Sequence, residues 1–113
     1  GFKVVAVFDN DPRKISRKGK IPVLPVQGLE RFIKARELDL GIIAVPYFAA
    51  QEVAGRMTAA GIKGILNFAP VSLKVPGDCF VSNINVQLEL ETVSYFAKIM
   101  KENKKHSQQK KAL

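Results

Sequence analysis

Three polar residues, Asp9, Asn10 and Asp11, follow directly on an apolar, β-branched run near the start of the chain, Phe2–Phe8. In a dinucleotide-binding βαβ unit, the second strand ends at such a carboxylate, which accepts hydrogen bonds from the ribose hydroxyls of the adenosine half. The G-x-G-x-x-G turn that belongs about 20 residues upstream of it has no counterpart in this sequence. An Asp followed by Asp-Pro also makes ordinary turns and helix caps. The pattern alone therefore leaves a ribose contact and a simple turn equally open.

Two later segments also follow apolar runs that the pattern predicts to be strands. Ligands of an open parallel sheet bind outside the carboxyl ends of its strands. The candidates for ligand contact at this edge are Asp9, Asn10, Asp11, Val45, Pro46, Asn67, Phe68, Ala69 and Pro70. A structural role stays open for two of them, because Pro46 could simply end its strand and Asn67 could bond to the local backbone.

These residue types favour binding over catalysis. The candidate edge has no His/Cys/Asp cluster at metal-ligand spacing and no Ser or Cys beside a base. The single cysteine, Cys79, is far in sequence from the single histidine, His106, which lies in a polar tail, so we expect a structural thiol. One cysteine cannot form an internal disulfide, which fits a reducing cytoplasm. The sequence therefore predicts a cytoplasmic protein that is not an enzyme and has no metal site.

Length and composition describe one ordinary globular domain. The chain has 113 residues, 47% of them hydrophobic and 25% charged, and no apolar run approaches the roughly 18 residues that cross a bilayer. The net charge of +8 comes largely from two clusters: one in residues 13–20, and one at the C-terminus with six lysines and one glutamate from Lys98 onward. Such clusters can bind phosphates, but lysines also complement a helix C-terminus.

The hydrophobic pattern alternates between strand and helix. Continuous apolar runs are typical of strands covered on both faces, whereas apolar residues at helical spacing indicate helices. The predicted strands are Phe2–Phe8, Ile21–Val23, Leu40–Val45, Ile62–Phe68 and Cys79–Val81. The predicted helices are Leu29–Arg36, one from Ala49 that ends at Gly61, and one from about Val86 onward. This order predicts an α/β fold with a Rossmann-like parallel sheet, truncated at its N-terminal side, and a protruding C-terminal helix.

The last helix carries more apolar surface than one narrow seam requires. Val93, Tyr95, Phe96 and Met100 contribute it. An extra apolar face on a terminal helix favours a partner subunit, although the helix could instead fold back on its own sheet.

Several blocks together resemble the NAD(H)-sensing Rex transcriptional repressors. The blocks occur in order at compatible spacing up to Met100 and read V-F-D-N-D-P-R-K-I from Val7, I-P-V from Ile21, I-I-A-V-P from Ile42, A-A-Q-E-V-A from Ala49, G-I-K-G-I-L-N-F-A-P from Gly61 and L-E-L-E-T-V-S-Y-F from Leu88. Rex proteins have an N-terminal winged helix that binds DNA, a Rossmann domain and a C-terminal helix exchanged within a homodimer. NADH releases them from their operators.

The resemblance implies a role for each part of this chain. Residues 1–84 would form a partial NAD(H)-binding Rossmann domain, residues 85–100 a swapped dimerisation helix and residues 101–113 a basic tail. Asp9 would hold the adenosine ribose. The loops at Val45-Pro46 and Phe68-Ala69-Pro70 would lie along the cofactor toward the nicotinamide. The chain would then be the cofactor-binding and dimerisation part of a redox-sensing repressor, whose operator contact needs a winged helix that this sequence does not contain.

Two departures limit this expectation. The sequence has neither a winged helix nor a glycine-rich turn, so we expect either a fragment or a shortened gene product. An alternative is a CoA-binding Rossmann domain of the acyl-CoA ligase type, in which the basic residues of positions 13–20 would meet the CoA 3′-phosphate. A dehydrogenase remnant is disfavoured because, apart from the carboxylates Asp9 and Asp11, no residue that could act as an acid or base lies at this edge of the sheet.

The missing turn predicts weak cofactor binding. A pyrophosphate normally bonds to the helix N-terminus that follows the glycine-rich turn, and this sequence offers no such turn. We therefore expect the chain as given to bind NADH weakly in calorimetric titration. A low-micromolar dissociation constant would contradict this expectation.

Overall fold

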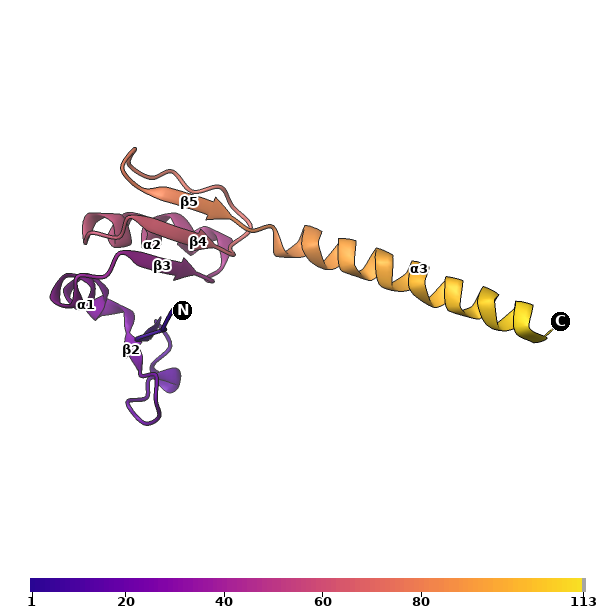
Figure 1. Cartoon of the computed structure of the whole chain (residues 1–113). Helices are drawn as coiled ribbons and strands as arrows, with labels where there is room; N and C mark the ends of the chain where they lie inside the picture. Colours follow the sequence, from indigo (N-terminus) through magenta and orange to yellow (C-terminus); the bar gives the residue numbers. More distant parts are fainter. Residues whose placement is uncertain (113) are drawn as a thin grey trace.

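The chain folds as alternating strands and helices in a computed structural model that describes the backbone of residues 1–112 and the side chains of residues 1–105. Its elements are β1 (Val7–Asp9), β2 (Val23–Pro25), α1 (Leu29–Arg36), β3 (Leu40–Ile43), α2 (Tyr47–Ala59), β4 (Gly64–Asn67), β5 (Phe80–Asn83) and α3 (Val86–Ala112) (Figure 1). Two single-turn 3-10 helices, η1 (Pro12–Lys14) and η2 (Val26–Gly28), flank β2. The α/β class predicted from the sequence is confirmed.

The strands form two parallel sheets. β1 pairs with β2, and β3, β4 and β5 pair in that order, with every ladder parallel. In the Rossmann order 3-2-1-4-5-6, β2 and β1 match positions 3 and 2, and β3, β4 and β5 match positions 4, 5 and 6. No strand of residues 1–112 takes position 1, which would join the two sheets. The predicted Rossmann-like arrangement of parallel strands is confirmed, and the structure shows that these strands form two separate sheets.

Some strand boundaries differ from the predicted ones, because pairing with a neighbouring strand decides where each strand begins and ends. Pairing in the predicted strand Phe2–Phe8 begins only at Val7, and β1 then continues to Asp9. Phe2 is 93% exposed, and β1 has a partner strand on one side alone. The predicted strand Ile21–Val23 begins later, at Val23, and ends at Pro25. The remaining strands are shifted or shortened at their ends by a few residues.

The two shorter helices agree closely with the sequence pattern. α1 spans the predicted residues and ends at Glu37, whose φ of 52° closes the last turn. α2 begins at Tyr47, earlier than predicted, because Pro46 occupies the N-cap position. After α2, Gly61 adopts a φ of +117°, a backbone region that glycine enters without steric cost.

α1 and α2 cover one face of the sheets, and the core lies beneath them. The buried cluster joins Leu29 and Ile33 of α1 to Ile43 of β3 and Ala50 and Ala54 of α2. Gly41 faces α2 as well, since a Cβ there would meet the Met57 sulfur at 2.9 Å. The side chains that alternate with these in β3 point to the opposite face, which no helix of residues 1–112 covers.

Helix α3 leaves the domain and does not fold back on the sheet (Figure 1). The Asn85 side chain caps it by accepting a hydrogen bond from the Leu88 amide at 3.0 Å. The radius of gyration is 20.1 Å, well above the about 13 Å of a compact domain of this size. The predicted basic tail, residues 101–113, continues this helix to Ala112, but the side chains of residues 106–113 lie outside the described ones. Within the described residues, no helix combines the length and apolar character that a membrane span requires.

Candidate functional site

A shallow cavity opens at the carboxyl end of β1, where the sequence predicted a ligand. Its volume is about 330 Å³, and it is lined by Asp9, Asn10, Pro12, Ile15, Pro25 and Gln27. Asp9 is the last residue of β1 and is half-buried, whereas Asn10 is exposed. The cavity therefore combines a carboxylate and amide groups with proline and isoleucine walls, which suits a sugar and a flat apolar ring better than a purely charged ligand.

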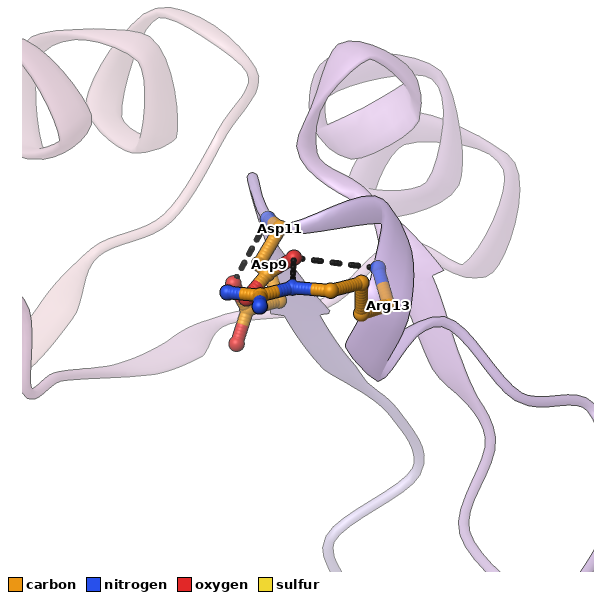
Figure 2. Close-up of polar contacts among 3 residues, drawn as sticks. All are labelled: Asp9, Asp11 and Arg13. Carbon is orange, nitrogen blue, oxygen red and sulfur yellow. Dashed lines mark hydrogen bonds and ion pairs between the residues drawn. The ribbon is translucent and has the colours of Figure 1, made fainter.

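Three side chains of the β1 end form one polar chain (Figure 2). Asp9 Oδ1 accepts a hydrogen bond from the Asp11 amide at 2.9 Å. Asp11 Oδ1 in turn accepts from the Arg13 amide at 3.0 Å and from its Nε at 3.1 Å, and Asp11 Oδ2 pairs with the Arg13 guanidinium at 3.1 Å. Asp9 Oδ2 has no hydrogen-bond partner among residues 1–105. Asp11 thus shapes the loop, and the second carboxylate oxygen of Asp9 is not used by it.

The pairing with Arg13 changes the acidity of Asp11. Hydrogen bonds from the Arg13 side chain and backbone, aided by the charge of Lys14, hold the pKa of Asp11 below its ordinary value of 3.8. The Asp11 carboxylate is therefore ionised at neutral pH and committed to Arg13. It acts as the cap of η1, since Pro12 begins that helix and lacks an N–H.

The second group of predicted residues gathers at the carboxyl ends of β3 and β4. These ends are in register, with Ile43 opposite Asn67, and the Phe68 amide donates to the Ile43 carbonyl at 2.8 Å. Val45 and Pro46 follow β3 and lead into α2, and Ala69 is buried while Pro70 is exposed. The two loops are therefore neighbours, and we call Val45, Pro46, Phe68, Ala69 and Pro70 the apolar ledge, of which Pro46, Phe68 and Pro70 are exposed.

Asn67 lies beneath this ledge rather than on it. Its side chain is 0% exposed. Its Nδ2 donates to the Val71 carbonyl at 2.8 Å and to Asn83 Oδ1 at 2.9 Å, and its Oδ1 accepts from the Ala69 amide at 3.0 Å. Asn67 thus offers a ligand no free polar atom in this conformation. It joins β4, β5 and the following loop, which is the local-backbone role that the sequence left open.

The two groups of predicted residues do not share one cavity. The cavity beside Asp9 is lined only by the β1–β2 part of the chain, and none of the ledge residues contributes to it. Three of its lining residues, Ile15, Pro25 and Gln27, were not among the predicted ones. Only their nearness to the end of a predicted strand could have indicated them, because their side-chain types carry no binding motif.

The basic cluster of residues 13–20 lies in η1 and in the loop that leads to β2, where its side chains are exposed. Arg13 is engaged with Asp11. Arg17 lines a second, open cavity of about 810 Å³ next to α1, together with Arg31 and Arg36 of that helix. The cluster therefore borders the Asp9 cavity without closing over it.

Among the described residues, no group of three or more His, Cys, Asp or Glu side chains could hold a metal ion. Burial, with a smaller effect of the Asp78 charge, raises the pKa of the Cys79 thiol. Cys79 packs against the core cluster and makes a weak contact to the Phe80 carbonyl. This environment favours the neutral thiol, as expected for a structural cysteine.

Known families match the chain over most of its length. The family described as CoA binding domain matches residues 1–71. The redox-sensing transcriptional repressor Rex of Carboxydothermus hydrogenoformans is 45% identical over 96 residues, which cover 84% of this chain and 46% of the relative. The redox-sensing transcriptional repressor Rex of Clostridioides difficile is 44% identical over 105 residues, which cover 92% of this chain and 49% of the relative. The chain thus spans about half the length of the curated relatives it matches.

Solved structures agree with these relatives. RSP, a Rex-family repressor, has a TM-score of 0.77 and 39% identity, and the match covers 93% of this chain and 51% of RSP. RSP with β-NADH gives the same values, and RSP with β-NAD⁺ and operator DNA gives a TM-score of 0.76 over 93% of this chain and 49% of RSP.

The buried network of Asn67 predicts a stability loss. Asn67→Ala leaves the buried Ala69 amide without its partner, at a cost of about 1–3 kcal/mol, and also removes the hydrogen bonds to the half-buried Val71 carbonyl and the exposed Asn83 side chain. We expect the free energy of unfolding of this variant, measured by urea denaturation, to be lower than that of the unaltered chain by at least about 1 kcal/mol. Asn83→Ala removes one partner at an exposed position and should cost less. Equal losses in the two variants would contradict the central role of Asn67.

The Asp11–Arg13 pair predicts a pH effect. Because the pKa of Asp11 is lowered in the folded state, the contribution of the pair is present above the unfolded value of 3.8 and is lost as pH falls through the lowered value. In Arg13→Gln, NMR titration of the carboxyl carbon should give an Asp11 pKa closer to 3.8. Arg17→Gln is the matched control and should leave it unchanged. An identical Asp11 titration in Arg13→Gln would refute the assignment.

Proposed function

This chain belongs to the CoA binding domain family and is a relative of the Rex redox-sensing repressors, and on that premise we propose that it is the NAD(H)-binding and dimerisation part of a repressor that responds to the NADH/NAD⁺ ratio. Residues 1–84 would bind the cofactor, residues 85–100 would form the dimer, and residues 101–113 would be a basic extension. Operator contact would belong to a winged helix outside the 113 residues.

The observation that carries the proposal is the free carboxylate oxygen of Asp9 in a cavity of about 330 Å³. A ribose presents two vicinal hydroxyls, and a carboxylate at a strand end can accept hydrogen bonds from both. The Asp11 amide engages Oδ1 and fixes the direction of the Asp9 side chain. Asn10, which lines the same cavity, would add a polar contact, and Asp11 would act indirectly by shaping the loop.

The apolar ledge would take the nicotinamide half. Pro46, Phe68 and Pro70 supply exposed apolar surface, and Val45 and Ala69 support it from the core side, an environment that suits an aromatic ring. Asn67 would contribute by holding the Phe68–Pro70 loop, because its polar atoms are already engaged. An oxidised and a reduced nicotinamide differ in charge, so an apolar ledge is a place where the two redox states could bind with different affinity.

Sensing of this kind needs differential binding and no catalysis. A ligand shifts a conformational equilibrium only by the difference between its affinities for the two states. RSP has been solved with NADH, and with NAD⁺ together with operator DNA. We propose the same pair of ligands for this chain. Among the described residues that line the candidate cavity, Asp9 is the one ionisable side chain, and the proposal assigns it to the ribose.

Helix α3 would form the dimer through two apolar faces. Val93, Phe96 and Met100 are exposed and recur at intervals of three and four residues, so they lie on one face, and Tyr95 lies on the opposite one. The four predicted interface residues therefore do not form a single stripe. A helix with apolar residues on both sides fits insertion between surfaces of a partner subunit better than a simple side-by-side pair.

A CoA ligand is the second candidate, favoured by the description of the matching family. The basic residues of positions 13–20 would then meet a 3′-phosphate. Arg13 is less suited to this role because Asp11 already pairs with its guanidinium. The curated relatives reported above are Rex repressors, which supports the dinucleotide.

The ligand assignment predicts selective stabilisation. Thermal denaturation of the chain in millimolar NADH, NAD⁺ or CoA should show a higher midpoint with the dinucleotides than with CoA, because binding to the folded state stabilises it. Asp9→Ala removes charge-assisted hydrogen bonds worth about 1.5–3 kcal/mol and should weaken NADH binding by about 10- to 100-fold. Asp39→Ala is the exposed acidic control. A larger shift with CoA would contradict the proposal.

The dimer assignment predicts a mass near twice 12.5 kDa in sedimentation equilibrium. Phe96→Lys places a charge on the apolar face of each subunit and loses about 1.5–3 kcal/mol of burial per copy. The dissociation constant of the dimer should therefore rise by about 100-fold or more. Ser94→Lys adds the same charge between the apolar faces and should have little effect. A monomer at the highest concentrations of the unaltered chain would exclude this dimer.

A further inference from the structure

Three arginines surround one open cavity beside α1. Arg17 reaches it from the loop before β2, and Arg31 and Arg36 belong to α1. The cavity has a volume of about 810 Å³, which is within the range of small-molecule sites. We call it the arginine cavity.

Within residues 1–105, these arginines lack the acidic partners that the other arginines of the chain have. Arg13 is paired with Asp11. Arg56 is paired with Glu30, whose carboxylate lies 2.6 Å from the Arg56 Nε. Glu30 lines the arginine cavity, but its charge is thereby already engaged. Among the described residues, the positive charge of the cavity is therefore left without a counter-charge.

The face of α1 toward the cavity has charged borders and a low floor. Arg31 and Arg36 lie about 140° apart around the helix axis, with Phe32 and Ala35 between them. Gly28 precedes the helix, and a Cβ added there would meet no atom within 4 Å. Because Gly28 and Ala35 carry almost no side chain, the space between the two arginines stays unfilled.

An aromatic contact holds one of the guanidinium groups in place. Arg36 Cζ lies 4.8 Å from the centroid of the Phe32 ring, and Phe32 is itself fixed by the Phe8 ring, which it meets edge-on at 5.3 Å. A guanidinium stacked on a ring keeps its N–H groups for the oxygens of a phosphate. Arg36 is therefore oriented before an anion arrives, which lowers the entropy cost of binding.

We propose that the arginine cavity binds a small polyphosphate anion, either inorganic or as the phosphate chain of a nucleotide. Guanidinium groups match phosphate oxygens with paired, charge-assisted hydrogen bonds. The three arginines approach from two elements and from both borders of a helix face. A chain of phosphates can contact all of them, whereas a single phosphate engages fewer.

The arginine cavity is separate from the Asp9 cavity. The two linings share Pro25 and Gln27, but Asp9 lines only the smaller cavity. A carboxylate repels a polyphosphate, so the anion binds on the arginine side. There it would tie the loop that carries Arg17 to α1, the helix that packs against both sheets. The proposal does not depend on NAD(H).

An NMR titration of the unaltered chain tests the site. Tripolyphosphate is added at a constant ionic strength of about 0.15 M, and the Nε–Hε signals of the arginine side chains are followed. The signals of Arg17, Arg31 and Arg36 should shift to saturation. Those of Arg13 and Arg56, which already pair with carboxylates, should move little. Equal shifts of all arginine signals would indicate non-specific attraction and overturn the proposal.

Matched substitutions on α1 test the position of the anion. Arg31→Gln and Lys34→Gln each remove one positive charge from an exposed position, but Lys34 does not line the cavity. Arg31→Gln should weaken tripolyphosphate binding by about 10-fold, and Lys34→Gln by less than about 2-fold. Ala35→Leu keeps every charge, fills the floor of the cavity and should also weaken binding. Equal effects of the two charge removals, or full binding in Ala35→Leu, would overturn the proposal.

Other probes separate the sources of the anion. ATP is compared with tripolyphosphate in Asp9→Ala, so that the Asp9 cavity does not contribute. Tighter binding of ATP assigns the site to a nucleotide whose base rests on the apolar wall at Leu24 and Pro25, and equal or weaker binding assigns it to the phosphate chain alone. Inorganic phosphate that binds as tightly as tripolyphosphate would reduce the site to one phosphate and contradict the proposal.

Two further outcomes define what the proposal excludes. A DNA duplex that shifts the same three arginine signals at lower concentrations than tripolyphosphate would assign the cavity to a nucleic-acid backbone and reject a small anion. Tripolyphosphate has no ribose, so its binding should be the same in Asp9→Ala as in the unaltered chain. Failure of this proposal is therefore distinct from failure of the proposed function, which depends on Asp9.

Discussion

Apolar packing beneath helix α1 holds the two sheets of this chain together, because no backbone ladder joins them. Phe8 of β1 meets Phe32 of α1, and Leu29 and Ile33 of the same helix share a buried cluster with Ile43 of β3. Arg56 of α2 adds a polar tie to this region, with its Nε 2.6 Å from Glu30 and its terminal nitrogen 2.6 Å from the Val26 carbonyl. The position of Asp9 relative to β3 and β4 therefore depends on one helix of eight residues.

This arrangement divides the candidate site into two parts of different character. The Asp9 side is polar and formed by a short loop that Asp11 and Arg13 hold in shape. The β3–β4 side is apolar and held from below by the buried amide of Asn67. A dinucleotide has the same division, with a hydroxyl-rich ribose at one end and a flat ring at the other. In the proposed function, a ligand that contacts both parts reports on the distance between them, which is the quantity that the packing of α1 controls.

Helix α3 connects the site to a partner in the proposed dimer. Its N-terminus is anchored next to the Asn67 network, because the Ile84 amide donates to the Asn67 carbonyl at 2.8 Å and Asn85 caps the helix. In proteins most helical stability comes from the packing of an apolar face, and the exposed apolar residues on two faces of α3 supply such a surface. Movement at the ledge would thus reach the dimer through a direct backbone connection.

The sequence by itself determined the local features. Alternating apolar runs predicted the α/β class, helical spacing predicted α1, and Gly61 marked the end of α2, although α2 begins earlier than the predicted Ala49. The acidic stop at Asp9 and the ordered blocks shared with Rex repressors indicated a dinucleotide site. These signals are readable because hydrophobic period, proline and glycine act on residues that are neighbours in the chain.

Only the tertiary structure decided the rest. It divided the strands into two sheets, shortened the Phe2–Phe8 run to three paired residues, buried Asn67 under the loop it was predicted to serve, and committed Asp11 to Arg13 while leaving Asp9 an oxygen free. It also separated Tyr95 from Val93, Phe96 and Met100 around the axis of α3. Each outcome depends on which residues become hydrogen-bond or packing partners. Such partners can be distant in sequence, so the residues around a strand or a polar side chain do not reveal them.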